Sequence, residues 1–420
     1  ELTPGGLSRT ITDKNGFLWD LGGHIIFNHN LPYYDEAVRW AVHEWNTFKR
    51  NCQIDISYMY NEKSLHLVPY PAQYAIPLFP AHIKKNCLED FKVCCENEKK
   101  INLIKNFDQW IATNFGETLN KYFFTPYTKK VWTVEPIEMN SIWVASRVAK
   151  LPHEKLEELC TLTAENLKNV DLGWGPNAQF MFPRNGGTGA IWKAMVTNID
   201  AINKKIIYEN RKFELFEISY DVLINTSPID QLIENTKLCR SLDLKHNKVI
   251  IVGIGLKKPI SMIAKQYTWL YFPDESIPFY RLTFISQYGI MTPDNRNFWS
   301  ILCESAQPSD SKITEEEIMQ RTINCLILKS IISYEQIVSK FSMVLPYGYP
   351  IPTVNRDTEL ARAHQALEKH QIYSRGRFGG WKYEASNQDH CFVQGKEIVD
   401  RILLGQPETI YKNGLSMSHG

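Results

Sequence analysis

Trp19-Asp20-Leu21-Gly22-Gly23-His24 is the stretch that decides the fold. It ends a predicted hairpin over residues 10–20, whose turn is marked by Asn15-Gly16, a dipeptide typical of two-residue hairpin loops. Paired glycines directly after a strand let the backbone approach a flat or phosphorylated ligand closely, and they place an imidazole beside it. Another glycine pair, Gly5-Gly6, precedes the hairpin in Thr3-Pro4-Gly5-Gly6-Leu7. Two ordinary glycine turns would give the same letters, so the interpretation depends on the rest of the chain.

A second glycine-rich stretch, residues 376–381 (G-R-F-G-G-W), lies near the end of the chain. It leads into a predicted helix from about Asn387 to Leu404. The start of a helix carries about half a positive charge and unpaired N–H groups, so it stabilises an anion. The pattern therefore indicates an anion site at the beginning of this helix.

Composition excludes several classes of protein. The 420 residues include 47 Lys and Arg against 46 Asp and Glu, and a net charge of +1 gives no overall attraction for nucleic acid or an anionic membrane. Nine cysteines without a C-x-x-C pair argue against both a zinc site and a disulfide framework, and for a reducing, cytoplasmic location. The longest apolar run, around 249–256, is far shorter than the roughly 18 residues of a membrane helix. We expect no metal site and leave a homo-oligomer open.

Periodicity predicts a mixed α/β chain without repeats. Helices are predicted over 35–45, 107–124, 151–167, 188–199, from 229 onward, 315–331, 358–370 and 387–404. Strands are predicted over 204–209, 212–219, 221–225, 248–256, 267–272, 279–286 and 298–304. We expect a Rossmann-like nucleotide-binding domain from segments 1–35, 186–235 and 371–410. A helical insert domain should cover 75–170, and an antiparallel substrate-binding sheet should use 50–74, 171–185 and 240–355.

Further motifs follow in a fixed order along the chain. They are Pro69-Tyr70-Pro71-Ala72-Gln73, F-T-P-Y-T-K-K-V-W at 124–132, Trp143, Gly175-Pro176-Asn177-Ala178, G-G-T-G-A-I-W at 186–192, W-L-Y-F-P at 269–273, P-F-Y-R at 278–281, Tyr349, and the stretch 376–390. In this order and spacing, from residue 3 to about 405, the chain resembles the eukaryotic type of UDP-galactopyranose mutase. Ala72 departs from the family, which usually has Phe there, and this puts uracil stacking in doubt.

The resemblance implies an FAD-dependent isomerase that interconverts UDP-galactopyranose and UDP-galactofuranose. In the family, reduced FAD attacks the anomeric carbon of the sugar through N5 and expels UDP. The flavin–sugar adduct then opens and recloses through another hydroxyl, without net redox change. The expected cofactor is FAD in its reduced form, with NADPH or NADH as reductant, and the expected partner is UDP-galactose.

The resemblance also assigns residues. Gly23, His24 and Arg281 are the expected catalytic group, with the imidazole and the Gly23 carbonyl at the flavin edge and an always-charged fork for the diphosphate. Expected substrate-binding residues are Phe27, Tyr70, Gln73, Asn140, Trp143, Arg147, Asn177, Trp269, Tyr271, Arg281, Tyr349, Tyr383 and Asn387. Expected cofactor-binding residues are Gly5, Gly6, Leu7, Gly22, Gly23, His24, Gly376, Arg377, Asn387 and Gln388.

The chain begins after the strand, G-x-G-x-x-G turn and helix that open such flavoproteins. We therefore expect the chain as given to bind FAD poorly. Two alternatives stay open: a flavin amine oxidase or desaturase, and a truncated homologue without catalytic activity.

Overall fold

The computed structural model describes residues 3–27, 29–96, 104–144, 147–167, 170, 175–199 and 219–411. The α-helices are α1 (Pro32–Ala41), α2 (Ser57–Tyr60), α3 (Ala81–Glu96), α4 (Phe107–Leu119), α5 (Thr125–Trp132), α6 (His153–Thr161), α7 (Ala164–Leu167), α8 (Gly189–Asn198), α9 (Ile229–Thr236), α10 (Met262–Gln266), α11 (Glu315–Leu328), α12 (Arg356–Glu368) and α13 (Gln388–Leu404). The strands are β1 (Thr10–Thr12), β2 (Leu18–Asp20), β3 (Trp45–Lys49), β4 (Cys52–Asp55), β5 (Leu67–Pro69), β6 (Gln179–Pro183), β7 (Leu223–Asn225), β8 (Asn247–Lys257), β9 (Trp269–Tyr271), β10 (Arg281–Thr283), β11 (Phe298–Pro308), β12 (Ile337–Leu345) and β13 (Ile372–Ser374). The predicted strands 204–209 and 212–219 lie outside the described residues, except for Ser219, which belongs to no strand.

A seven-stranded sheet in the order β12-β8-β11-β10-β9-β4-β5 forms the centre of the molecule. Its neighbouring strands are antiparallel, as predicted, apart from the parallel pair β4 and β9. Side chains of the apolar strand β8 alternate between two cores: Ile251 points into one, and Ile250 and Val252 point into the other. Both faces of the sheet are therefore covered, which explains why β8 is hydrophobic along nearly its whole length.

The hairpin predicted over 10–20 is present as β1 and β2, and it lies on one face of this sheet. The contact depends on Gly253 of β8, because a Cβ added there would come within 2.5 Å of the Trp19 ring. Phe17 stacks on Trp19 with ring centroids 5.8 Å apart, and Trp19 stacks on Phe341 of β12 at 5.7 Å. A glycine on the central strand thus lets flat rings bring the end of the hairpin onto the sheet.

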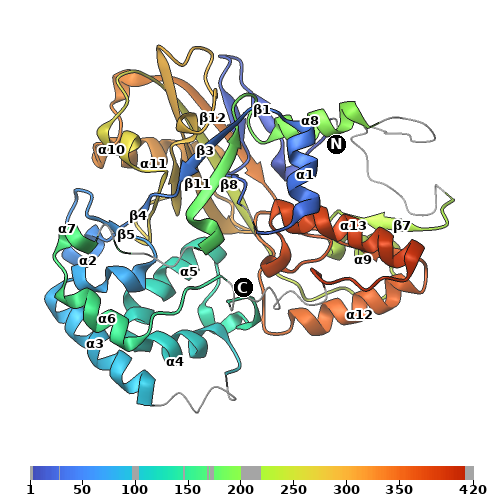
Figure 1. Cartoon of the computed structure of the whole chain (residues 1–420), viewed down its shortest axis with the longest axis horizontal. Coiled ribbons are helices and arrows are strands. Elements are labelled where there is room, and N and C mark those ends of the chain that lie inside the picture. Colours follow the sequence, from blue (N-terminus) through green and yellow to red (C-terminus); the bar gives the residue numbers. More distant parts are fainter. Residues whose placement is uncertain are drawn as a thin grey trace.

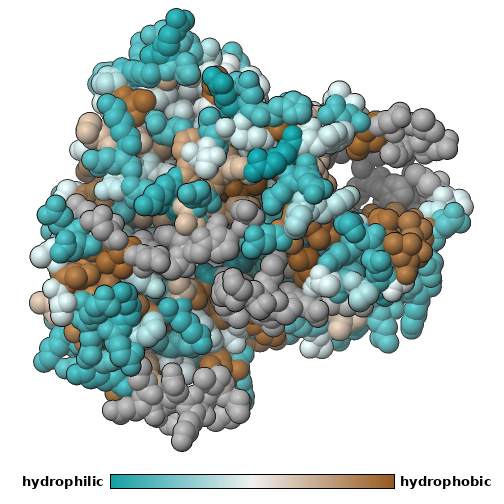
Figure 2. Space-filling view, in the orientation of Figure 1, coloured by the Kyte–Doolittle hydropathy of each residue, from teal (hydrophilic) through white to brown (hydrophobic). Residues whose placement is uncertain are grey.

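Figure 1 shows the helices α3 to α6 gathered below the sheet, while α1, α8, α9, α12 and α13 form a separate group beside it. In this second group β7 and β13 pair in parallel. Figure 2 shows hydrophilic side chains spread over the visible face, interrupted by small apolar patches. No helix among the described residues combines the length and the apolar character needed to span a membrane.

Two predicted helices differ from the structure. The helix predicted over 35–45 begins at Pro32 and ends at Ala41, and Trp45 opens β3, which pairs with β6. Proline suits the first turn of a helix because its missing N–H would have no partner there, and this signal was overlooked. The helix predicted over 151–167 is two helices, separated where Leu162 takes an extended conformation.

Candidate active site

A cavity of about 2540 Å³ lies where the sheet meets the two groups of helices. Ordinary ligand pockets measure about 300–1,000 Å³, so this one has room for two ligands side by side. Nearly all the predicted site residues line it: Gly5, Gly6, Leu7, Gly23, His24, Phe27, Tyr70, Gln73, Trp143, Arg147, Asn177, Trp269, Tyr271, Arg281, Tyr349, Gly376, Arg377, Tyr383, Asn387 and Gln388. Residues predicted from separate motifs thus meet around a single space.

A buried carboxylate fixes the glycine motif that follows β2. Asp20 accepts hydrogen bonds from Thr10 Oγ1 (2.5 Å) and from Thr188 Oγ1 (3.0 Å) and the Thr188 backbone N–H. Burial raises the pKa of Asp20 to about 6, against the effect of these hydrogen bonds. Asp20 therefore joins the hairpin to the turn that begins α8, and it sets where Gly22-Gly23-His24 leaves the sheet.

The turn at Gly22-Gly23 lies directly against Arg281 and Glu304. A Cβ on Gly23 would come within 2.8 Å of Thr283 Oγ1 and 3.3 Å of the Arg281 Cζ, and one on Gly22 within 3.2 Å of Glu304 Oε1. Only glycine leaves room for this approach. Gly22 itself does not line the cavity, so its role is spacing rather than contact.

Arg281 and Glu304 face each other on the paired strands β10 and β11. The Arg281 Nε and Nη2 both donate to the Glu304 carboxylate, the latter at 2.7 Å. Burial alone would raise the pKa of Glu304, but the Arg281 guanidinium holds it below its usual value. Since a guanidinium has two edges, this ion pair occupies the Nε–Nη2 edge and leaves the Nη1 end for another anion.

His24 lies beside this ion pair. Burial lowers its pKa to about 4, although the nearby Glu304 carboxylate opposes the shift. His24 is therefore neutral at pH 7 and can either donate or accept one proton. Its Nδ1 is buried without a hydrogen-bond partner among the described residues, which leaves one ring nitrogen available to a ligand.

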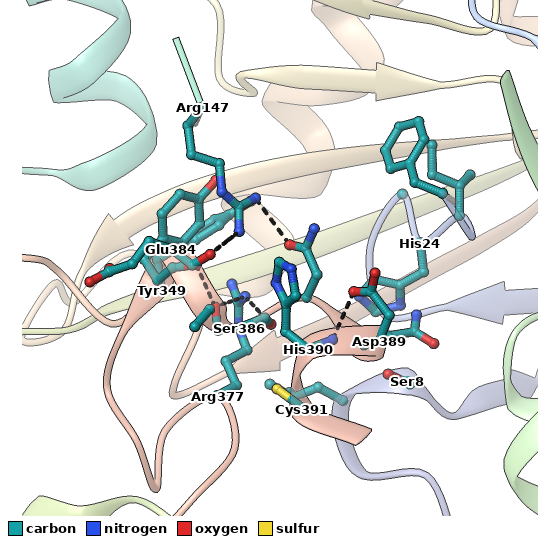
Figure 3. Close-up of a pocket in the computed structure, with 18 of the residues that line it drawn as sticks. Ser8, His24, Arg147, Tyr349, Arg377, Glu384, Ser386, Asp389, His390 and Cys391 are labelled. Atoms are coloured by element: carbon teal, nitrogen blue, oxygen red, sulfur yellow. Dashed lines mark hydrogen bonds between the residues drawn. The ribbon is translucent and has the colours of Figure 1, made fainter. Parts of the chain in front are cut away.

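Two tyrosines and a second arginine form the next part of the cavity wall. The hydroxyl of Tyr349 lies 3.2 Å from that of Tyr280, which donates to Glu304 Oε1. Arg377 lies over the Tyr349 ring at 5.0 Å, and its Nη1 and Nη2 donate to Ser386 Oγ (3.1 Å) and Gly348 O (3.1 Å). Figure 3 shows Tyr349, Arg147 and Arg377 grouped on one side of the view and His24 on the other. Arg377 is thus held as part of the wall.

Arg147 is also engaged with the protein. Its Nη1 donates to Asn387 Oδ1 (3.1 Å) and its Nη2 to Glu384 O (2.8 Å), while its Cζ lies 5.0 Å from the Tyr383 ring centroid. The helix α13 begins here, and no side chain caps it, because the Asn387 amide oxygen turns to Arg147 instead. The His390 N–H in this first turn donates to Asp389 Oδ1, so an anion site here would use the N–H groups that precede it.

Aromatic rings line another part of the cavity. Tyr70 and Tyr271 have centroids 4.7 Å apart, and Arg50 places its Cζ 5.1 Å from the Trp269 ring and 5.8 Å from the Phe27 ring. Arg50 was not predicted, and its only sequence signal is a basic residue at the end of an aromatic strand. Glu304 was also not predicted, because it lies in an otherwise apolar strand and belongs to no recognised motif.

The structure corrects the expectation for Asn140, which does not line the cavity. Its amide donates to Thr353 O (2.9 Å) and its Oδ1 accepts from the Ile142 N–H (3.1 Å). Asn140 therefore connects its own segment to the segment that contains Thr353. Gln73 lines the cavity, and its amide nitrogen donates one hydrogen bond to Ala149 O. Trp143 packs edge-to-face on Phe107 at 4.9 Å.

Comparison with solved structures identifies the family. The chain is similar to a reduced UDP-galactopyranose mutase, with 33% identity over 99% of this chain and 89% of the other, and a TM-score of 0.88. The chain belongs to the UDP-galactopyranose mutase family. No protein-family model matches the sequence.

More distant structures share the fold of this mutase family member. A protein called a protoporphyrinogen oxidase, from an Exiguobacterium species, has 14% identity and a TM-score of 0.68 over 95% of this chain and 91% of its own. Cyclohexylamine oxidase from Brevibacterium oxydans has 11% identity and a TM-score of 0.52 over 94% and 92%. These likenesses concern the architecture only.

Proposed function

We propose that this protein is a UDP-galactopyranose mutase that interconverts UDP-galactopyranose and UDP-galactofuranose. The observation that carries the proposal is the likeness, along nearly the whole chain, to a reduced mutase structure. An isomerase acting on a nucleotide sugar needs cations for a diphosphate and a separate surface for a base. Arginines and tyrosines surround one part of the cavity and aromatic rings another, which supports this reading.

The residues present fit FAD as cofactor. Gly6 and Gly376 have positive φ angles of 52° and 87°, and an added Cβ at either would have nothing within 4 Å, so both backbones face open space. Gln388 Oε1 and His24 Nδ1 are buried without hydrogen-bond partners among the described residues. Open backbone beside unsatisfied polar atoms suits a flat heterocycle with donors and acceptors on its edge. Reduced FAD would supply an electron pair at N5 for attack on the sugar.

The protein's own groups would then hold the substrate and the charge. Arg281 would bind the diphosphate through its Nη1 end, because Glu304 fixes the opposite edge and so fixes the direction of the fork. Tyr349, Tyr383 and Tyr271 would donate hydroxyls to phosphate oxygens. The start of α13 would stabilise negative charge on the reduced cofactor through its N–H groups.

Several finer assignments belong to the same proposal. The rings of Tyr70, Phe27 and Trp269 would hold the uridine, and NADPH or NADH would reduce the cofactor. Seven cysteines with described side chains form no disulfide, namely Cys52, Cys87, Cys160, Cys239, Cys303, Cys325 and Cys391, which supports a reducing compartment such as the cytoplasm. Association of identical chains stays a prediction.

The test is anaerobic product analysis of FAD-loaded protein with and without dithionite, together with peroxide detection under air. We expect UDP-galactofuranose to convert to UDP-galactopyranose only after reduction, because oxidised flavin is electrophilic at N5. Turnover of an amine with stoichiometric peroxide, and no furanose or pyranose product from the reduced protein, would replace the mutase by an amine oxidase. The amine oxidases share only the fold with this chain, so no observation favours them.

A further inference from the structure

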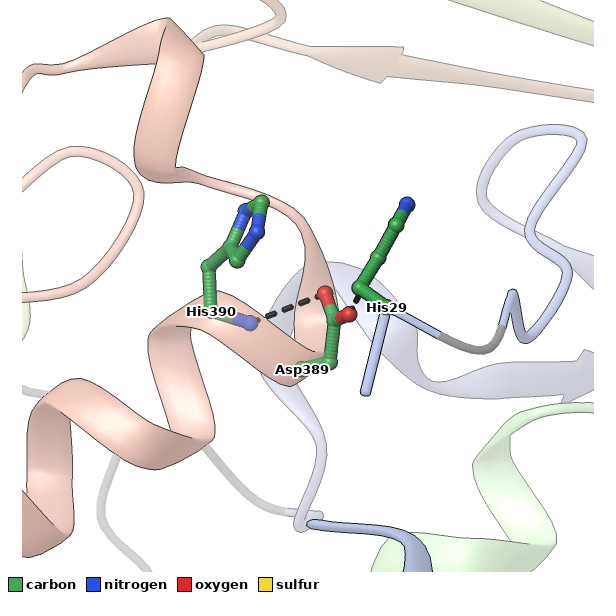
Figure 4. A group of neighbouring side chains, drawn as sticks. All are labelled: His29, Asp389 and His390. Atoms are coloured by element: carbon green, nitrogen blue, oxygen red, sulfur yellow. Dashed lines mark hydrogen bonds and ion pairs between the residues drawn. The ribbon is translucent and has the colours of Figure 1, made fainter. Parts of the chain in front are cut away.

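His29, Asp389 and His390 form a compact cluster at the edge of the cavity that the proposed reaction does not use. Asp389 and His390 stand in the first turn of α13, and His29 approaches from the segment after β2 (Figure 4). Their nitrogen and oxygen donor atoms all lie within 4.8 Å of one another. Asp389 and His390 are buried, at 5% and 7% exposure, and all three residues line the cavity.

The hydrogen bonds of His29 are the first unusual feature. Its Nδ1 lies 2.5 Å from Asp389 Oδ2, and its Nε2 lies 3.1 Å from Asn177 Oδ1. Both neighbours are oxygen atoms that accept. If a neutral imidazole donates through Nε2–H to Asn177, the lone pair on Nδ1 faces a lone pair of the carboxylate. A cation that contacts both atoms, either a proton or a metal ion, would remove this repulsion.

The second feature is the third donor, His390. Its Nδ1 is buried and has no hydrogen-bond partner among the described residues, and its ring is stacked nearly parallel to His29, with centroids 5.4 Å apart. A buried imidazole nitrogen without a partner is costly unless something binds it.

The surroundings of Asp389 complete the geometry. The His390 backbone N–H donates to Asp389 Oδ1 at 2.8 Å, so Oδ1 is held and Oδ2 faces the imidazoles. The bond from His29 Nε2 to the Asn177 carbonyl oxygen is the outer contact that metal-binding histidines usually make, and it leaves Nδ1 as the ligand atom. Two imidazoles and one carboxylate on one side of an ion would leave its other positions open to the cavity.

We propose that His29, Asp389 and His390 bind one divalent transition-metal ion, with open coordination positions toward the cavity. Two nitrogens and one oxygen suit Zn²⁺ or Co²⁺, whereas Mg²⁺ and Ca²⁺ prefer oxygen ligands alone. The lack of a C-x-x-C pair argues against a thiolate zinc site and says nothing about imidazole sites. The positive end of α13 and the nearby Arg147 oppose a cation, so we expect the site to be weaker than a structural zinc site.

The test titrates the purified protein with Co²⁺ and Zn²⁺, following the visible bands of Co²⁺ and the heat of Zn²⁺ binding. We expect one ion per chain, and at least a tenfold loss of affinity in Asp389→Asn and in His390→Gln. His82→Ala on α3, an exposed histidine in another part of the chain, is the matched control and should bind like the parent protein. Thermal unfolding of each variant shows that it is folded.

Two results would overturn the proposal. Absence of Co²⁺ bands at excess metal would mean that the cluster is an imidazole–carboxylate ion pair only. Unchanged affinity in His390→Gln would place the ion elsewhere. Because the assay measures metal binding and needs neither flavin nor substrate, its outcome is independent of whether the protein is a mutase.

Discussion

At the scale of single residues, the ion pair of Arg281 with Glu304 occupies the Nε–Nη2 edge of the guanidinium. Arg281 was predicted to bind the diphosphate, and it lines the cavity. No sequence pattern indicates that Glu304 occupies one edge of its guanidinium. The two residues are paired through strand register, and register is decided by the packing of the whole sheet.

Arg281→Ala should leave flavin content unchanged and weaken UDP binding. Removing one partner of a desolvated charge pair costs about 2–5 kcal/mol, so we expect a loss of roughly 30-fold or more in affinity. Arg281→Lys should recover only part of the lost affinity. An ammonium group has no separate edges, so it cannot hold Glu304 on one side and phosphate on the other as a guanidinium can. Isothermal titration with UDP measures both, and parent-like affinity in Arg281→Ala would remove Arg281 from the site.

A matched double variant separates binding from folding. Arg281→Ala leaves the Glu304 carboxylate buried and unpaired, which should also cost stability, by about 3–5 kcal/mol. Adding Glu304→Gln removes the buried charge, so stability should recover while UDP affinity stays low. Recovery of both together would mean that Arg281 acts on UDP only by keeping the sheet folded.

At the scale of elements, sequence predicted the helices, strands and turns that depend mainly on their own residues. The Asn15-Gly16 turn, the long apolar strand β8 and the helix α13 were all expected close to where they lie. The strands β3 and β12 were not predicted. Each is partly exposed and each depends on a partner far along the chain, β6 for β3 and β8 for β12. Such strands are defined by pairing rather than by their own sequence.

Gly253→Ala should destabilise the contact between the hairpin and β8. The added Cβ would come within 2.5 Å of the Trp19 ring, which has no exposed space to move into, and overpacking of this kind costs about 1–3 kcal/mol. Because Asp20 and the glycine turn follow Trp19, flavin content should fall as well. Urea unfolding and flavin absorbance measure the two effects.

Gly395→Ala is the natural control for this experiment. Gly395 lies inside α13, and a Cβ there would have nothing within 4 Å. Alanine in a helix interior is favoured over glycine by about 0.5–1 kcal/mol, so this variant should gain stability. Equal effects of the two alanines would show that the Trp19 contact does not decide the position of the hairpin.

At the scale of the whole molecule, the cavity is lined by segments between Thr3 and Ile410. Their order along the chain predicted the family, and the structural likeness to a mutase confirms it. The spacing of the motifs alone could not predict which of these side chains would hydrogen-bond to the backbone of a distant segment. Tertiary contact decides these bonds: Arg147 donates to Glu384 O, Gln73 donates to Ala149 O, and Asn140 donates to Thr353 O.

Buried histidines should make the folded protein sensitive to acid. Burial lowers the pKa of His24 and His390 to about 4 and that of His364 to about 3, below the ordinary value of 6.5. Between these values the unfolded chain binds protons that the folded chain does not, so stability falls as pH falls below 6.5. Asp20, whose pKa burial raises to about 6, takes up a proton in the folded state and opposes the trend between pH 6 and 3.8.

Each group that is protonated in only one of the two states changes the free energy of unfolding by about 1.4 kcal/mol per pH unit. Three histidines opposed by one aspartate therefore lower the free energy of unfolding by roughly 2–3 kcal/mol per pH unit between pH 6 and 5. Urea unfolding at pH 7, 6 and 5 measures this slope. His364→Gln removes one of the three histidines and should reduce the net slope by about half, because Asp20 already offsets nearly one of them. A free energy of unfolding that stays constant or rises from pH 7 to 5 would mean that these imidazoles are protonated in the folded protein, and that His24 enters the site as a cation.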